Sequence, residues 1–234
     1  MTSLGRPDRI RKLVDSYAWG QHSTVYLTLY DGDARLQEYL DQRWPACWQV
    51  EVVKMAGNGP TYNEMLRRYP DEPCYGFMAD DQLLETEDML RVLEIAAKDW
   101  NVAYANDKHH GEKIPTMPCI GGELARAVGY LAPEHITHWG IDCCWYEIGK
   151  RLDSLVYLEH MTYTHENPVW GTAPDDRTYA LARQRSFGYQ DLFRAWKLGG
   201  ELDKAVSRVM AAKGILTDGL PDGYFWGHVP IAGL

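Results

Sequence analysis

The sequence contains no long apolar run. None of its apolar stretches approaches the roughly 20 residues that a membrane-spanning helix needs. The first residues also lack the basic segment followed by an apolar one that marks a signal peptide. We therefore expect a soluble, cytoplasmic protein without a membrane span.

Cysteine spacings typical of metal sites or disulfides are missing as well. The cysteines are an odd number, Cys47, Cys74, Cys119, Cys143 and Cys144, and their spacing matches no metal-binding motif. Cys143 and Cys144 are adjacent, which is a poor geometry for a disulfide between them. Buried free thiols are the prediction.

Positive charge is scarce outside one segment. The formal net charge of −9 argues against a protein that coats nucleic acid, because it would repel the phosphate backbone. Residues 177–213 are the exception, with eight Lys or Arg against three Asp or Glu, interleaved with Tyr179, Phe187, Tyr189, Phe193 and Trp196. This mixture suits a polyanionic acceptor. Charge patterning favours the alternative, a solvated helical face whose aromatic residues turn into the core.

Strands and helices alternate through the first half of the chain. A length of 234 residues, 45% of them hydrophobic, suits one sizeable domain. Apolar β-rich runs predict strands at 25–30, 48–53, 73–81 and 102–105, and helical spacing predicts helices at 7–14, 33–43, 62–68 and 86–97. This order predicts an α/β fold, a doubly wound, mostly parallel sheet flanked by helices.

The second half is less regular. A mobile polar loop is expected at 106–115, helices at 123–129 and 142–150, and a strand at 155–164. Two helices joined at Gly199-Gly200 are expected between 176 and 213, so the C-terminal region should be helical. The aromatic tail after Gly214 should pack on the body, because its large side chains would be costly to expose.

The run from Pro73 to Asp81 ends in two adjacent carboxylates, Asp80 and Asp81. In an open α/β sheet, ligands bind at the carboxyl ends of the strands. Hard oxygen ligands placed there suit Mg²⁺ or Mn²⁺ carrying a substrate diphosphate. The alternative is that both residues only form a turn or cap the helix expected from about Thr86.

Several short motifs follow one another in a fixed order. They are Ser3–Pro7, Asp31–Asp33, Gly76–Asp81, Gly111–Thr116, and His165–Pro168 ahead of Gly171–Asp176. As an ordered set over roughly residues 1–179, they resemble nucleotide-sugar glycosyltransferases of the GT-A fold, related to family 2 and to enzymes common in phage genomes. The resemblance implies one GT-A-like domain (1–234), with a nucleotide-sugar-binding half (1–105), an acceptor and metal half (106–176) and a helical C-terminal region (177–234).

The resemblance also implies a metal site. Asp81 would hold a Mn²⁺ or Mg²⁺ ion that bridges the donor diphosphate, and Asp80 would contact the sugar or ribose. The ion would neutralise charge on the leaving diphosphate. His165 matches the histidine that completes the metal shell, although a lone histidine is more often structural. His160, five residues earlier, is its competitor.

An inverting transfer is implied too, in which a base takes the proton of the acceptor hydroxyl opposite the leaving group. Asp142 matches this base; its alternative role is the N-cap of the helix predicted there. Asp31 matches the residue that receives the uracil or ribose, so a UDP-sugar is the expected donor, but Asp31 could equally form an Asx turn. Ser3 and Arg6 would face the diphosphate.

The sequence departs from the resemblance at its start. Only Met1 and Thr2 precede Ser3, where members of the family have a full apolar strand. Either the first strand is very short or the natural chain is longer.

The acceptor is the least constrained part of the prediction. The phage resemblance and the basic segment 177–213 suggest a hydroxymethylated pyrimidine in phage DNA, which would place the enzyme in the host cytoplasm. The alternatives are a glycosyltransferase for a surface glycan or small molecule, a non-catalytic nucleotide-sugar-binding protein, or a nucleotidyltransferase, since strand-end acids serve many chemistries. The presence of Asp142 in addition to the acid pair favours transfer.

Overall fold

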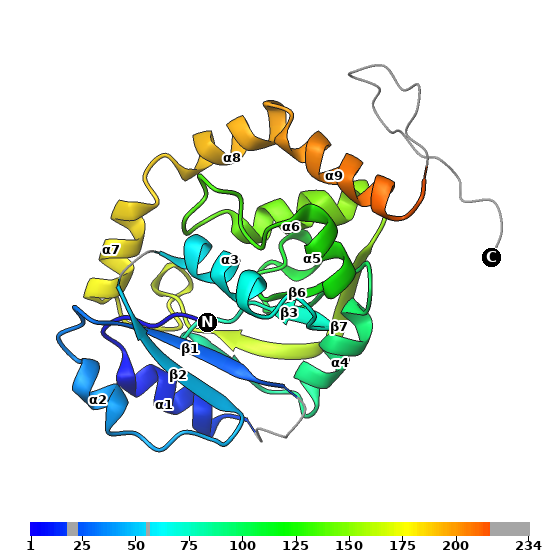
Figure 1. Cartoon of the computed structure of the whole chain (residues 1–234). Helices are drawn as coiled ribbons and strands as arrows, with labels where there is room; N and C mark the ends of the chain where they lie inside the picture. The colour runs from blue at the N-terminus through cyan, green and yellow to red at the C-terminus, as the bar shows by residue number, and fades with distance from the viewer. Residues whose placement is uncertain (18–22, 55–56, 216–234) are drawn as a thin grey trace.

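The computed structural model describes residues 1–17, 23–54 and 57–215, which form an α/β arrangement (Figure 1). The strands are β1 (Val25–Tyr30), β2 (Trp48–Val53), β3 (Cys74–Gly76), β4 (Gln82–Leu84), β5 (Val102–Asn106), β6 (Pro118–Gly121) and β7 (Leu155–His165). The helices are α1 (Pro7–Asp15), α2 (Leu36–Leu40), α3 (Asn58–Arg68), α4 (Met89–Ala97), α5 (Gly122–Val128), α6 (Ile141–Arg151), α7 (Arg177–Arg185), α8 (Tyr189–Leu198) and α9 (Glu201–Ala212).

The strands of the described residues form two sheets. β1 and β2 pair in parallel, and a larger sheet has the order β3-β6-β5-β7-β4. Parallel strands flanked by helices, with a helical C-terminal region, confirm the predicted fold class. Within the larger sheet only β5 and β7 are parallel, and the β3–β6, β5–β6 and β4–β7 pairs are antiparallel. β5 and β6 are joined by a loop rather than by the crossover helix that a parallel pair requires.

β5 is the central strand and is buried on both faces. Its successive side chains point to opposite faces of the sheet. Val102 packs in a core with residues of α5, α6 and α9, whereas Ala103 packs in a second core with residues of α1, β1 and α4. The larger sheet therefore carries helices on both faces, as a run of buried strand residues leads one to expect.

Residues 1–3 lie between the two sheets. Thr2 forms a single parallel bridge with Thr28 of β1. The Ser3 hydroxyl donates a hydrogen bond of 2.6 Å to the Asp80 carboxylate, which follows β3. The place of a full first strand is thus taken by one bridge and one side-chain hydrogen bond.

Helices α7, α8 and α9 curve around the outside of the molecule and end beside α5 and α6 (Figure 1). The sequence predicts two helices here, but a second break separates α7 from α8. Gly188 and Gly200 take left-handed conformations, with φ of 81° and 89°, directly before α8 and α9. Such a φ favours glycine, and it ends each preceding helix.

Other differences concern element boundaries. α3 begins at Asn58, although Gly57–Pro60 were expected to break the chain; Pro60 lies in the first turn, where its missing N–H costs no helical hydrogen bond. α2 ends at Leu40, earlier than predicted. β4 and β6 were not predicted. Most of the aromatic tail, residues 216–234, lies outside the described residues.

The remaining absences from the sequence can be compared with the structure. In the described ranges, no helix combines the length and the apolarity needed to cross a membrane. All the cysteines are free, as predicted, with Cys119 and Cys144 buried and the others partly buried.

Candidate active site

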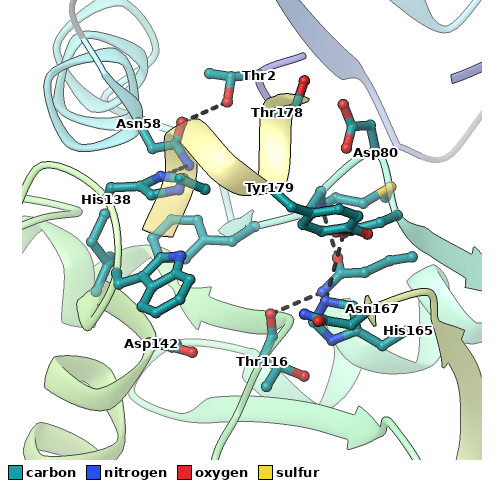
Figure 2. Close-up of a pocket in the computed structure, with 18 of the residues that line it drawn as sticks. Thr2, Asn58, Asp80, Thr116, His138, Asp142, His165, Asn167, Thr178 and Tyr179 are labelled. Atoms are coloured by element: carbon teal, nitrogen blue, oxygen red, sulfur yellow. Dashed lines mark hydrogen bonds and ion pairs between the residues drawn. The ribbon is translucent and has the colours of Figure 1, made fainter. Parts of the chain in front are cut away.

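A cavity of about 770 Å³ lies where the N-terminal segment, the residues after β3, and helices α6 and α7 meet. Figure 2 shows Asp80, Tyr179 and His165 along one side of this cavity and His138 and Asp142 along the other. Most of the predicted site residues are among its lining residues: Ser3, Arg6, Asp80, Asp81, Asp142 and His165.

Asp31 is not among the lining residues. It is exposed in the turn after β1, and its backbone N–H donates to the carbonyl of Val53 at 3.0 Å. The side-chain hydrogen bonds of this turn belong instead to Asp33, whose carboxylate accepts from the N–H groups of Gly5 and Arg35 at 2.6 and 2.9 Å. A donor-binding role for Asp31 stays a prediction.

Asp80 and Asp81 lie in the turn between β3 and β4, and their side chains are only 8% and 9% exposed. They do not cap the helix that follows. β4 intervenes, and the N-cap residue of α4 is Asp88. The helix-cap alternative is therefore wrong, and the two carboxylates face the cavity instead.

The Arg6 guanidinium holds the acid pair in place. Its Nη1 lies 3.1 Å from Oδ1 of Asp80 and 3.8 Å from Oδ2 of Asp81. Its Nε and Nη2 donate to both oxygens of Asp176, at 3.0 and 2.9 Å. This two-point contact has the geometry of a strong arginine–carboxylate pair, so Arg6 fastens the acid turn to the start of α7.

Tyr179 of α7 completes this wall of the cavity. Its ring lies under the Arg6 guanidinium, 3.8 Å from ring centre to Cζ. Its hydroxyl donates to Oδ2 of Asp81 at 3.0 Å. One oxygen of Asp81 is thus satisfied by α7, while the other is left toward the cavity.

Burial raises the pKa of both carboxylates. For Asp80, desolvation and the neighbouring charge of Asp81 outweigh the opposing contacts with Arg6 and Ser3 and raise the pKa to about 6. Desolvation also raises the pKa of Asp81, against the charge of Arg6. Two buried carboxylates share one guanidinium that Asp176 also engages. The turn therefore favours an additional cation.

Asp81 and His165 offer such a cation two ligands. Oδ1 of Asp81 and Nδ1 of His165 are buried atoms without a hydrogen-bond partner in the described residues. Nε2 of His165 lies 3.6 Å from Oδ1 of Asp81. The antiparallel register that pairs Gln82 with His165 brings the imidazole to this position. An orphaned carboxylate oxygen beside an imidazole suits a divalent ion such as Mn²⁺.

Among the described residues, no three His, Cys, Asp or Glu side chains group into a metal site. Mg²⁺ is commonly held by only one or two protein carboxylates, with water and substrate phosphates completing its shell. Burial lowers the pKa of His165 to about 4 and so keeps the imidazole neutral, the form that binds metals. The pair therefore fits an ion that arrives with a phosphate substrate. The competitor, His160, is exposed on β7.

Asp142 lies across the cavity, in the first turn of α6. The N-cap position belongs to Gly140, with a left-handed φ of 93°, so the alternative role of Asp142 as N-cap is wrong. Oδ1 of Asp142 accepts the N–H of Cys143 at 2.8 Å. Burial raises the pKa of this carboxylate, which makes it a stronger base once it is ionised.

Sequence reasoning missed the part played by α7. Asp176 is the N-cap of α7, where its side chain accepts the N–H of Tyr179 at 2.9 Å, and the same carboxylate binds Arg6. The sequence signal was the motif Gly171–Asp176, but no pattern within it points to a partner 170 residues away.

Asn58 and His138 form a second missed contact across the cavity wall (Figure 2). The Thr2 hydroxyl donates to Oδ1 of Asn58 at 2.7 Å, and Nδ2 of Asn58 lies 3.0 Å from Nδ1 of His138. The N-terminal segment, the start of α3 and the turn before α6 are thereby joined.

The basic segment 177–213 is largely paired with acids. Four of its cations form ion pairs with carboxylates: Arg183 with Asp175, Arg194 with Asp191, Lys197 with Glu147, and Lys204 with Glu201. Arg208 donates to the carbonyl of Val128, and Lys213 lies over the ring of Trp100. These contacts agree with a solvated helical face rather than an open cationic surface.

Comparison with known proteins places the fold. No protein-family model matches the sequence, and no curated protein matches it. Among solved structures, the mannosyltransferase PcManGT from Pyrobaculum calidifontis, in complex with GDP-Man and Mn²⁺, is similar over 91% of this chain and 72% of its own, with a TM-score of 0.57 and 10% identity. TarS of S. aureus is similar over 69% of this chain, with a TM-score of 0.52 and 13% identity, and the chain spans 35% of its length. The protein thus has a fold found in glycosyltransferases.

Proposed function

We propose that this protein is a metal-dependent glycosyltransferase that moves a sugar from a nucleoside diphosphate sugar to an acceptor hydroxyl. One observation carries the proposal. The buried Asp80–Asp81 turn leaves an unpaired oxygen beside His165, in a cavity whose opposite side holds the buried carboxylate of Asp142. The fold found in glycosyltransferases supports the same conclusion.

In this proposal the nucleoside diphosphate lies beside the acid turn. Asp81 and His165 hold a Mn²⁺ or Mg²⁺ ion, which supplies neutralisation of the diphosphate charge. Ser3 and Arg6 fix the position of Asp80, through contacts of 2.6 and 3.1 Å, so that it can contact the sugar or ribose. The base of the nucleotide, uracil or guanine, is left for experiment.

Asp142 is the proposed general base. It takes the proton of the acceptor hydroxyl, the hydroxyl oxygen attacks the anomeric carbon, and the bond from that carbon to the diphosphate breaks. Because Asp142 and the acid turn lie on opposite sides of the cavity (Figure 2), the attack comes opposite the leaving group and inverts the anomeric configuration. A purely nucleotide-binding protein has no need of this second buried carboxylate.

For the acceptor we favour a glycan or a small molecule over DNA. The pairing of the basic segment with acids removes the support that composition lent to hydroxymethylated DNA. Trp139 and Tyr189 line the cavity close to Asp142 in the chain and in space, and Trp139 is 42% exposed. Exposed aromatic rings at a cavity rim are suited to stacking on a sugar ring.

The test is thermal stabilisation by a panel of UDP- and GDP-sugars, with and without Mn²⁺ or Mg²⁺. A ligand at 100 times its Kd should stabilise the protein by about 2.7 kcal/mol, a shift of several degrees. We expect this shift in the presence of the ion, and its loss in Asp81→Asn. Asp88→Asn is the matched control: it neutralises a carboxylate outside the cavity, at a left-handed position that Asn tolerates.

Metal-independent binding, or equal binding by Asp81→Asn, would contradict the metal assignment. For a sugar nucleotide that binds, release of the nucleoside diphosphate in the presence of acceptor or water separates a transferase from a binding protein. Binding with no release under any condition would overturn the enzymatic proposal.

A further inference from the structure

The loop after β5 is built around one buried carboxylate. The Asp107 side chain is 1% exposed, and its Oδ1 accepts the N–H groups of His109 and His110 at 3.0 and 2.7 Å. Its Oδ2 accepts the hydroxyl of Thr116 at 3.1 Å and lies 2.6 Å from Nδ1 of His110. The segment expected to be a mobile polar loop is instead tied to Asp107, and the His110 ring is held in one orientation.

The hydrogen bonds determine which nitrogen of His110 carries a proton. Burial alone would raise the pKa of Asp107, but the bonds from the His110 ring and the two backbone N–H groups lower it, so the carboxylate is ionised and Nδ1 donates to it. The same bond raises the pKa of His110. Its other nitrogen, Nε2, has no hydrogen-bond partner in the described residues, and His110 lines the cavity.

His110 lies at the metal end of the cavity. The Trp170 ring makes edge contacts with both His110 and His165, at centroid distances of 5.2 and 5.0 Å. His165 is the proposed metal ligand beside Asp81. His110 and His165 therefore share one aromatic neighbour, and a diphosphate at the ion comes within reach of the His110 ring.

The charge of the cavity wall leaves a role for this group. Among the described residues that line the cavity, Arg6 is the only Arg or Lys, whereas three aspartates line it: Asp80, Asp81 and Asp142. Arg6 is already bound to Asp80 and Asp176. A diphosphate entering this wall lacks a free arginine or lysine, so its charge must be met by an ion and by a protonated histidine.

We propose that His110, oriented by Asp107, donates a hydrogen bond from Nε2 to a phosphate oxygen of the donor diphosphate. The inference rests on the proposed function, because it assumes a nucleoside diphosphate in the cavity. His110 then binds the leaving group directly, and Asp107 is a positioning residue that acts through the imidazole.

Calorimetric titration with UDP, GDP and the corresponding monophosphates, in the presence of Mn²⁺, tests this contact. A charge-assisted hydrogen bond contributes roughly 10- to 100-fold in affinity. His110→Gln should therefore weaken diphosphate binding by about this factor and leave monophosphate binding within about 2-fold, since the contact is made only by the diphosphate. His109→Gln is the matched control; it removes the neighbouring imidazole, which stacks on Trp170 at 4.0 Å but does not line the cavity.

The outcomes distinguish the inference from the function. Equal diphosphate affinity in wild type and His110→Gln overturns the contact while leaving the glycosyltransferase proposal intact. So does an equal loss for mono- and diphosphates, or a loss for sugar nucleotides alone. If neither UDP nor GDP binds the wild type, the proposed function and this inference fall together. Unchanged thermal midpoints of both variants without ligand would show that the loop still folds.

Discussion

At the scale of single residues, the site depends on two buried carboxylates that face each other with different surroundings. Asp81 has a guanidinium nearby and a neighbouring acid, whereas Asp142 has its own helix start and the N–H of Cys143. Burial raises the pKa of each. The first suits a cation and the second suits proton transfer, so substitution should separate their effects.

Asp142→Asn should lower the rate of transfer roughly 10²-fold or more while leaving donor affinity nearly unchanged, because a general base acts on the acceptor proton. Steady-state transfer and calorimetric donor binding measure the two effects. Because burial raises the pKa of Asp142, the wild-type rate should fall on the acid side at a higher pH than for an exposed carboxylate.

Glu147→Gln serves as the control for Asp142→Asn. It removes a carboxylate of the same helix that pairs with Lys197 outside the cavity lining, so its transfer rate should stay within about 2-fold of wild type. Equal losses of donor affinity and rate in Asp142→Asn would show a structural role for Asp142.

Residue identities in the site were predictable where the sequence gives a local signal. Asp80 and Asp81 end an apolar run, and His165 ends a strand, so their type and place carry information. Asp176 and His110 carried none, since their roles depend on partners that the fold supplies: Arg6 for the first, and the cavity wall for the second.

At the scale of elements, α7 is fastened by adjacent aspartates in very different settings. Asp176 caps α7 and holds the buried Arg6, whereas Asp175 pairs with Arg183 in an exposed contact. Both pairs join an aspartate to an arginine. Their contributions to stability should nevertheless differ, because the cost of losing a partner grows with the burial of the charge left behind.

Asp176→Ala should lower the free energy of unfolding by about 2 kcal/mol or more, through the lost N-cap and the weakened hold on Arg6. Asp175→Ala should change it by less than about 1 kcal/mol, as expected for an exposed pair. Urea titration of both variants measures the difference. Similar losses would contradict a fastening role for Asp176.

The pH dependence of this pair follows from Asp176. Burial alone would raise its pKa, but the bonds from Arg6 and from the Tyr179 N–H lower it below the ordinary 3.8. A lowered pKa in the folded state contributes stability above pH 3.8 that is lost as the pH falls through the folded value. The gap between wild type and Asp176→Ala should therefore close in acid.

Long periodic elements were predictable, and short ones were not. Strands β1, β2 and β7 and helix α6 lie close to their expected ranges because their patterns persist over a turn or several residues. β4 and β6 are three and four residues long, too short for periodicity, and they form because neighbouring strands supply hydrogen bonds.

At the scale of the whole molecule, net charge and charge pairing together bear on the acceptor. A chain with a formal charge of −9 repels polyanions, and the cations of α7, α8 and α9 are held by carboxylates. A glycan or small acceptor avoids this repulsion, whereas a nucleic acid does not.

We therefore expect duplex DNA, hydroxymethylated or not, to bind more weakly than about 10⁻⁴ M at physiological salt, the weak end of non-specific DNA binding. Fluorescence anisotropy of a labelled duplex measures this affinity, and Arg183→Glu and Lys204→Glu should leave it unchanged. Micromolar binding that falls steeply with salt and is lost on charge reversal would restore the DNA hypothesis.

The contact between Arg6 and Asp176 joins residues 170 positions apart, and that between Leu4 and Thr178 joins residues 174 apart. During synthesis, the acid turn leaves the ribosome long before the carboxylate that fixes Arg6. The cavity wall is then completed only when α7 has emerged and folded back onto the first residues. Contacts this distant in sequence close late and slow folding. Nucleotide binding by a growing chain would thus report that almost all of the described fold has formed.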